Sequence, residues 1–105
     1  MLQQIQHCFL QRQVIYTQHA RIEMENEAFG EIREHEVVEC VEDGKIIEEY
    51  PSDDPYPSCL IYGRTQTKRP LHVVCAYSEE DHLTIIITVY QPDPEKWEEY
   101  TRRKL

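Results

Sequence analysis

The sequence predicts an α+β domain in which N-terminal helices and one C-terminal helix pack on one face of a four-stranded antiparallel sheet. Residues 69–90 place apolar side chains at every second position, as the two strands of a β-hairpin do. Residues 2–43 instead repeat their apolar side chains at helical spacing. A chain of 105 residues can build one modest core, so we expect a single α+β domain over residues 1–105.

The hairpin at 69–90 carries the strongest pattern in the chain. Successive side chains in a strand point to opposite faces, so every second residue shares a face. The residues of the apolar face are Leu71, Val73, Cys75, Tyr77, Leu83, Ile85, Ile87 and Val89. The other face carries His72, Thr84, Thr88 and Tyr90. A hairpin is not stable alone, so we expect helices to cover the apolar face and to leave the other face partly open.

Three helices are predicted before the sheet. The first lies within residues 2–13, where an apolar stripe follows one side. Thr17 is placed to cap a second helix that ends near Gly30. A third helix is expected from about residue 33 to residue 43, with Gly44 as its left-handed stop.

Two further strands are predicted between the helices and the hairpin. Residues 45–50 form a short strand at an edge of the sheet, and residues 58–64 form the next strand. Three prolines between them indicate a connection rich in turns.

A last helix is expected after the sheet. Asp93 is placed to cap it, and Pro94 suits its first position because that position needs no N–H donor. Trp97 and Tyr100 would then face the core.

The net charge of −9 is confined to the first half of the chain. Residues 1–57 hold 4 basic and 13 acidic side chains, whereas residues 58–105 hold 7 of each. An acidic half disfavours binding of nucleic acid by the whole surface. Any contact with RNA is therefore expected in the C-terminal half.

The remaining composition indicates a cytoplasmic protein without a membrane span or a secretory leader. No apolar run approaches the roughly 18 residues that a spanning helix needs. The four cysteines form no CxxC pair, so we expect reduced thiols in the core. A disulfide between Cys59 and Cys75 on neighbouring strands is the alternative.

The open face of the sheet is the candidate site. With five-residue hairpin loops, Tyr62 lies opposite His72, and His72 lies opposite Thr88. Arg64 and Tyr90 then follow two residues along on the same face. An imidazole transfers protons near neutral pH, a guanidinium stabilises a phosphorane's charge, and phenols stack on bases. This set is suited to cleavage of a phosphodiester.

The same residues also have ordinary structural interpretations. A histidine on the polar side of a strand is usually solvated, an arginine beside a turn is usually a surface charge, and half-buried tyrosines usually serve packing. The five histidines show no spacing typical of metal ligands. The basic tail, Arg102 to Lys104, could bind phosphate, but cations at a helix C-terminus are also favoured by the helix dipole, and we favour the dipole.

Four pieces of the chain resemble the bacterial domain-of-unknown-function family 4258, usually placed among the RelE/ParE-like toxins. They are YTQHA (16–20), EVVECVEDGKIIEEYPSDDPYPSCLIYG (36–63), RPLHVV (69–74) and ITVYQPDPEKW (87–97), in the family's order. The resemblance implies a small helix-plus-antiparallel-sheet fold. It also implies a toxin-like protein of a toxin–antitoxin pair that acts on messenger RNA, with a small antitoxin as partner.

Three residues are carried over from the family's motifs: His72, His19 and Tyr90. Arg64 and Arg69 are added for their chemistry and their place beside the hairpin. The catalytic candidates are His72, Arg64 and Tyr90, and the candidates for substrate binding are Tyr62, Arg69, Thr88 and His19.

Two functions are therefore expected to compete. The first is a metal-independent endoribonuclease of the mRNA interferase type, which needs no cofactor and is held by a cognate antitoxin. The second is a non-catalytic protein-binding module, a decayed toxin or regulatory partner, favoured by the acidic half. A metal-dependent hydrolase is disfavoured because the sequence lacks ligand spacing. The sequence implies nothing about oligomeric state.

Overall fold

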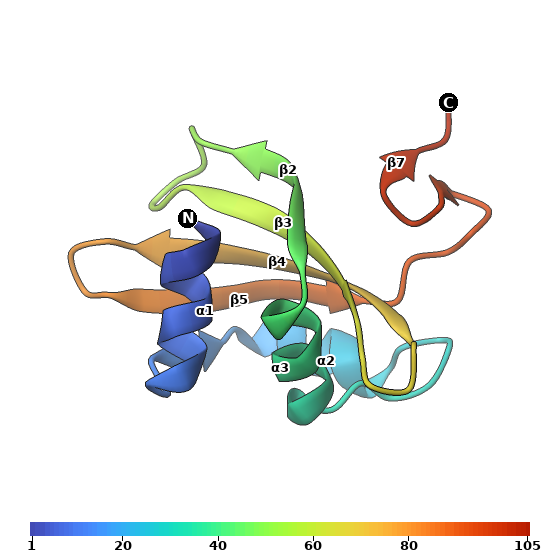
Figure 1. Cartoon of the computed structure of the whole chain (residues 1–105), viewed down its shortest axis with the longest axis horizontal. Helices are drawn as coiled ribbons and strands as arrows, with labels where there is room; N and C mark the ends of the chain where they lie inside the picture. Colours follow the sequence, from blue (N-terminus) through green and yellow to red (C-terminus); the bar gives the residue numbers. More distant parts are fainter.

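A computed structural model describes all 105 residues and contains three helices and two sheets (Figure 1). The helices are α1 (Leu2–Leu10), α2 (Gln18–Glu25) and α3 (Glu34–Glu42). The strands of the main sheet are β1 (Val14–Tyr16), β2 (Lys45–Tyr50), β3 (Ser58–Arg64), β4 (Pro70–Ser78) and β5 (Leu83–Tyr90). A separate small hairpin consists of β6 (Trp97–Glu98) and β7 (Arg102–Arg103).

The main sheet has five strands in the order β1-β5-β4-β3-β2, and it is mixed. β2 to β5 form the antiparallel part, as predicted, and β1 adds a parallel edge strand beside β5. The prediction of four antiparallel strands was therefore wrong at this edge. β1 is only three residues long, too short for an alternating pattern to distinguish it from a break between two helices.

The predicted C-terminal helix does not form. Pro94 follows Asp93, whose carboxylate accepts a hydrogen bond from the Glu95 N–H, and a turn results. Glu99 and Tyr100 then take positive φ angles of 50° and 64°, which no right-handed helix allows. The chain reverses instead, and Trp97 pairs with Arg103. The Trp97 side chain consequently packs on His72 and the Tyr100 side chain on Tyr62, and neither belongs to the core cluster beneath the helices.

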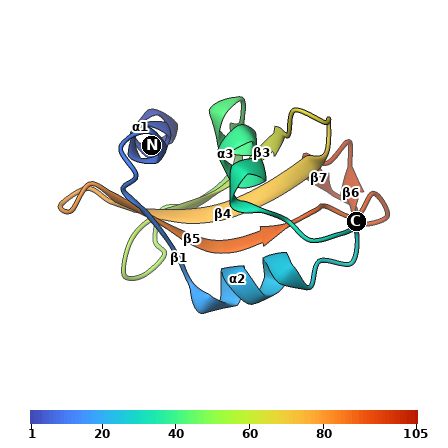
Figure 2. The ribbon, with the colours of Figure 1, turned by 90° about the horizontal axis from the view of Figure 1, so that it is seen from below.

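The core lies between the three helices and one face of the sheet. In Figure 2, α1 and α3 lie side by side over the sheet, and α2 runs along β5. Ile5 of α1, Met24 of α2 and Val37 of α3 share one cluster with the apolar faces of β3, β4 and β5. We call the opposite sheet face, which carries Tyr62, His72 and Tyr90, the outer face.

Two further predictions about the N-terminal elements are confirmed, whereas the predicted left-handed stop of α3 at Gly44 is wrong, because Gly30 is the glycine with a positive φ angle. The Thr17 hydroxyl caps α2 by accepting from the Ala20 N–H, and α3 lies within the expected range. α2 ends at Glu25, five residues before the expected stop at Gly30. All four cysteines are free and buried, although Cys59 and Cys75 are directly opposite each other on β3 and β4.

The register across β3 and β4 was also predicted correctly, since Tyr62 pairs with His72. The prediction that His72 pairs with Thr88 was wrong, because its partner is Tyr90. The turn after Ser78 has four residues and not five, and a bulge opposite Val74 and Cys75 inserts one more residue into β5. Both changes move the register in the same direction, and together they place the tyrosine beside the imidazole.

Gly63 allows α3 to lie directly on β3. A Cβ atom at this position would stand 2.1 Å from the backbone oxygen of Cys40. We expect Gly63→Ala to lower the free energy of unfolding by about 3 kcal/mol, because the helix must move away from the sheet. Urea denaturation measures this change. The exposed substitution Glu80→Ala should stay within about 0.5 kcal/mol of the parent, and equal stability of the two variants would contradict this packing.

Candidate functional site

Three aromatic side chains meet on the outer face because their strands are in register. Tyr62, His72 and Tyr90 occupy facing positions on β3, β4 and β5. The His72 ring lies 5.2 Å from the Tyr90 ring and 5.9 Å from the Tyr62 ring, centre to centre. The sequence prediction placed Tyr62 opposite His72 correctly, and Tyr90 takes the facing position that it gave to Thr88.

The imidazole of His72 is fully buried and both of its nitrogens have a partner. Nε2 lies 2.5 Å from the backbone oxygen of Tyr100, and Nδ1 lies 3.0 Å from the Tyr90 hydroxyl. A carbonyl oxygen only accepts, so Nε2 carries the proton and Nδ1 accepts from the phenol. Burial lowers the pKa of His72, which favours this neutral tautomer.

The hairpin of β6 and β7, residues 97–103, covers His72 from outside; we call it the C-terminal hairpin. Trp97 meets the imidazole edge to face at 4.4 Å, and the Tyr100 ring stacks on Tyr62 at 6.3 Å. Figure 1 shows this segment at the far end of the sheet from α1. The outer face, expected to be partly open, is therefore closed at His72.

A carboxylate also lies under the C-terminal hairpin. Glu48 on β2 receives two hydrogen bonds from the Arg103 guanidinium, at 2.9 and 3.1 Å, and one from the Tyr50 hydroxyl. These donors lower the pKa of Glu48, to which the electrostatic attraction of His72 also contributes. Sequence reasoning did not select Glu48. The available signal was its spacing of two from Tyr50 within a strand, which puts both on one face.

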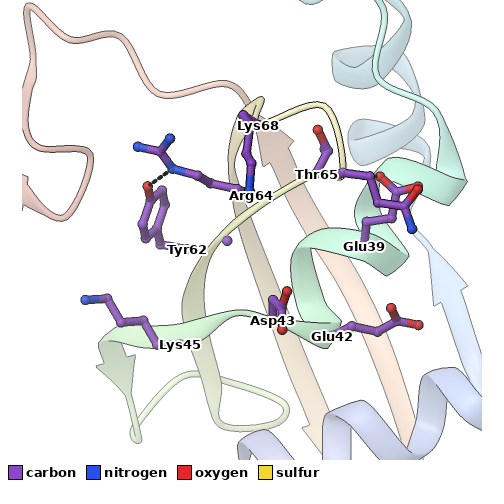
Figure 3. A pocket seen from close by; sticks show the side chains of 10 residues that line it. Glu39, Glu42, Asp43, Lys45, Tyr62, Arg64, Thr65 and Lys68 are labelled. Carbon is purple, nitrogen blue, oxygen red and sulfur yellow. Dashed lines mark hydrogen bonds between the residues drawn. The ribbon is translucent and has the colours of Figure 1, made fainter.

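Arg64 and Tyr62 border an open groove of about 630 Å³ beside the covered histidine (Figure 3). The Arg64 Nε donates to the Tyr62 hydroxyl at 3.0 Å, and the rest of the guanidinium is exposed. One wall of the groove is acidic and is formed by Glu39, Glu42 and Asp43. The other wall is basic and is formed by Lys45, Arg64 and Lys68. The groove thus offers cations next to a phenol ring.

Arg69 does not join this cluster. Its guanidinium donates to the backbone oxygens of Gly30 and Glu31, to the Glu36 carboxylate and to the Gln91 side chain. Only 16% of its side chain is exposed. Arg69 therefore connects the loop before α3 to the end of β5, and its donors are already used within the chain.

The other two predicted substrate-binding residues, His19 and Thr88, make no hydrogen bond to His72. His19 is on the exposed side of α2, with Glu23 as its neighbour at 4.0 Å. Thr88 faces Val74 on the outer face and is half-buried. The structure thus assembles Tyr62, Arg64, His72 and Tyr90, and it leaves out Arg69 and His19.

No group of three or more His, Cys, Asp or Glu side chains is placed to hold a metal ion. None of the helices is long and apolar enough to cross a membrane.

A known protein family covers the part of the chain that contains the sheet residues of this cluster. The sequence model of the family described as Domain of unknown function (DUF4258) matches residues 16–91, which is most of the chain. The chain belongs to the DUF4258 family. The DUF4258 match contains Glu48, Tyr62, His72 and Tyr90, and it ends before the C-terminal hairpin. No curated protein and no solved structure matches the chain.

The buried neutral histidine should make stability depend on pH. Above about pH 6.5 the imidazole is neutral in both the folded and the unfolded chain. Below it, the unfolded chain takes up a proton that the folded chain, with its lowered pKa, does not take up. We expect the free energy of unfolding to fall with pH below about 6.5, by at most about 1.4 kcal/mol per pH unit for this group.

Chemical denaturation of the parent and of His72→Gln, from neutral to mildly acidic pH, isolates this contribution. The difference between the two curves should shrink as the pH falls, since the other titrating groups are shared. A difference that stays constant with pH would show that His72 is protonated equally in both states.

Proposed function

We propose that this DUF4258 protein is a toxin-like endoribonuclease of the RelE/ParE-like type that cleaves messenger RNA without a metal ion. One observation carries the proposal: a carboxylate, an imidazole, two phenols and a guanidinium converge on one end of one sheet face. Glu48, His72, Tyr62, Tyr90 and Arg64 are these groups. Their types match what transfer of a phosphoryl group to a neighbouring hydroxyl requires.

The reaction follows from the two titratable groups. The Glu48 carboxylate takes the proton of a ribose 2′-hydroxyl, and that oxygen attacks the adjacent phosphorus. The bond from phosphorus to the 5′-oxygen breaks, and a proton from the imidazolium of His72 goes to this leaving oxygen. The products are a 2′,3′-cyclic phosphate and a free 5′-hydroxyl, so that neither water nor a metal ion is consumed.

The pKa directions support this division of roles. Arg103 lowers the pKa of Glu48 in the closed protein, and a glutamate of ordinary pKa is also ionised at neutral pH, so Glu48 is available as a base once Arg103 has left. Burial lowers the pKa of His72, whereas the attraction of Glu48 raises it. Displacement of the cover removes the burial contribution and leaves the attraction of the Glu48 carboxylate acting on the imidazole. The proton-donating form of His72 is then favoured when the site is open.

The proposal predicts that His72 and Glu48 are each needed for RNA cleavage. His72→Ala and Glu48→Gln should each lower the rate of RNA cleavage about 100-fold or more, in line with loss of a general acid or base. Cleavage of a fluorescent single-stranded RNA in the presence of a chelator measures the rate. Circular dichroism checks that each variant folds, and His19→Ala, on the exposed side of α2, serves as the control. Undiminished cleavage by folded His72→Ala protein would refute the proposal.

A second function is favoured by a different observation. His72 is fully buried, and the donors of Arg69 are used within the chain, so the resting protein presents neither group to a substrate. We therefore also propose a non-catalytic protein-binding module, whose partner would be the product of an adjacent gene. This alternative predicts a stable complex on co-expression and no cleavage of any RNA. Cleavage by the purified protein in the presence of a chelator would exclude it.

A further inference from the structure

We infer that the C-terminal hairpin occupies a nucleotide subsite, in which a base stacks on Tyr62 and a ribose oxygen contacts Nε2 of His72. A single-stranded nucleotide would displace the hairpin and take over its contacts. The inference rests on the proposed function for the kind of ligand. It adds the substrate position, the base platform and the reason why the resting site is closed.

The first observation is the stack of Tyr100 on Tyr62. The centres of the two rings are 6.3 Å apart, and the ring planes are inclined by only 27°. The three aromatic contacts that His72 makes are instead all edge to face. A flat ring over a tyrosine is the arrangement that a base takes in single-strand binding proteins. Tyr100 reaches it with a φ of 64°, which a residue other than glycine rarely adopts.

The second observation is the contact between the Tyr100 carbonyl oxygen and the Nε2 of His72. The oxygen belongs to the same residue as the stacked ring, so one residue supplies both a flat ring and an oxygen at the imidazole. A nucleotide presents the same pair of groups, a base and an oxygen of its sugar. The hairpin thus fills both positions at once.

The third observation is the contact of Arg103 with Glu48. The guanidinium binds the carboxylate through two nitrogens and lies 4.7 Å from the centre of the Trp97 ring. The hairpin therefore engages both groups to which the proposed reaction assigns proton transfer. We call the contact of Arg103 with Glu48 and Trp97 the latch.

The hairpin is held weakly enough to be displaced. Each of its strands has two residues, and Trp97 is its only buried side chain. The Arg103 side chain is 63% exposed, and ion pairs exposed to this degree contribute little to stability. Segments with few buried contacts open locally at a small fraction of the free energy of global unfolding.

The surroundings favour a nucleotide over a neutral ligand. Lys45 pairs with Tyr62 across β2 and β3, and Arg64 donates to the Tyr62 hydroxyl. Both cations, with Lys68, border the groove that opens beside the Tyr62 ring (Figure 3). A base on Tyr62 would place its phosphates toward this basic wall and away from Glu39, Glu42 and Asp43 on the other.

The test compares two neighbouring arginines in the full-length protein. Arg103→Ala removes the latch, and Arg102→Ala removes the same charge from an exposed residue that pairs only with Glu98. Binding of adenosine 3′-monophosphate is measured by calorimetry. The titration of His72 is followed by NMR in parallel. We expect Arg103→Ala to bind the nucleotide at least about tenfold more tightly than the parent, with Arg102→Ala unchanged.

Three further readouts make the result decisive. In Arg103→Ala the pKa of His72 should rise toward its ordinary value, because burial and the positive charge of Arg103 both lower it in the parent. Arg103→Lys, which keeps the charge and loses the two-nitrogen contact with Glu48, should raise it as well if the hairpin opens. Tyr62→Ala in the Arg103→Ala background should abolish the gain in nucleotide affinity. Inorganic phosphate should bind far more weakly than the nucleotide, since it lacks a base to stack.

The outcomes separate this inference from the proposed function. Tighter nucleotide binding by Arg103→Ala without RNA cleavage would support the subsite and refute the ribonuclease. RNA cleavage by the parent, with no gain in binding or rate for Arg103→Ala, would refute the subsite and support the ribonuclease. Equal affinity of Arg102→Ala and Arg103→Ala for the nucleotide would show that only the loss of a surface charge matters, and it would overturn the inference.

Discussion

The arrangement of the outer face depends on the burial of one imidazole. A buried polar ring is stable only when its nitrogens are paired, and His72 has a donor on one side and an acceptor on the other. The donor is a side chain on β5, which the register and the bulge bring opposite His72. The acceptor is a backbone oxygen of the C-terminal hairpin. The sheet therefore makes half of the site, and the chain beyond the sheet completes it.

Glu48 and Arg69 show how two charged side chains are used in different ways in this fold. Arg69 is enclosed by two carbonyl oxygens, a carboxylate and an amide, so it acts as a structural link between the α2–α3 loop and the sheet. Glu48 is held by a single exposed arginine and a tyrosine, so its partners can leave without uncovering an unpaired charge in the core. Glu48 can therefore exchange Arg103 for a substrate, whereas Arg69 cannot leave its partners without disrupting the fold.

Much of the fold was predictable because its signals are local. The Thr17 cap, the α3 helix and the alternation of β4 depend on neighbouring residues, and the structure confirms them. The predicted alternation of β5 was wrong before its bulge, because Ile86, and not Ile85 or Ile87, faces Cys75 and joins the core. The meeting of Tyr62 with His72 was predictable from a hairpin loop of the expected length. The cover over His72 was not, because it depends on positive φ angles at Glu99 and Tyr100 within a pattern that favours a helix. Glu48 was overlooked for a related reason, since its relevance appears only once the hairpin brings Arg103 to it.

The parallel strand β1 has a consequence for the solubility of the chain. β5 is rich in isoleucine, threonine and valine, and such a strand left unpaired is a template for aggregation. Its free edge is closed by a series of short contacts: Gln13 accepts from Thr84, Thr17 binds Ile86 and Ile87, and the Glu23 carboxylate accepts from Val89. These three partners precede the β5 residues that they bind by more than sixty positions, so they are synthesised before β5. In the folded protein the N-terminal segment therefore occupies the edge of β5 at which a strand of another molecule could pair.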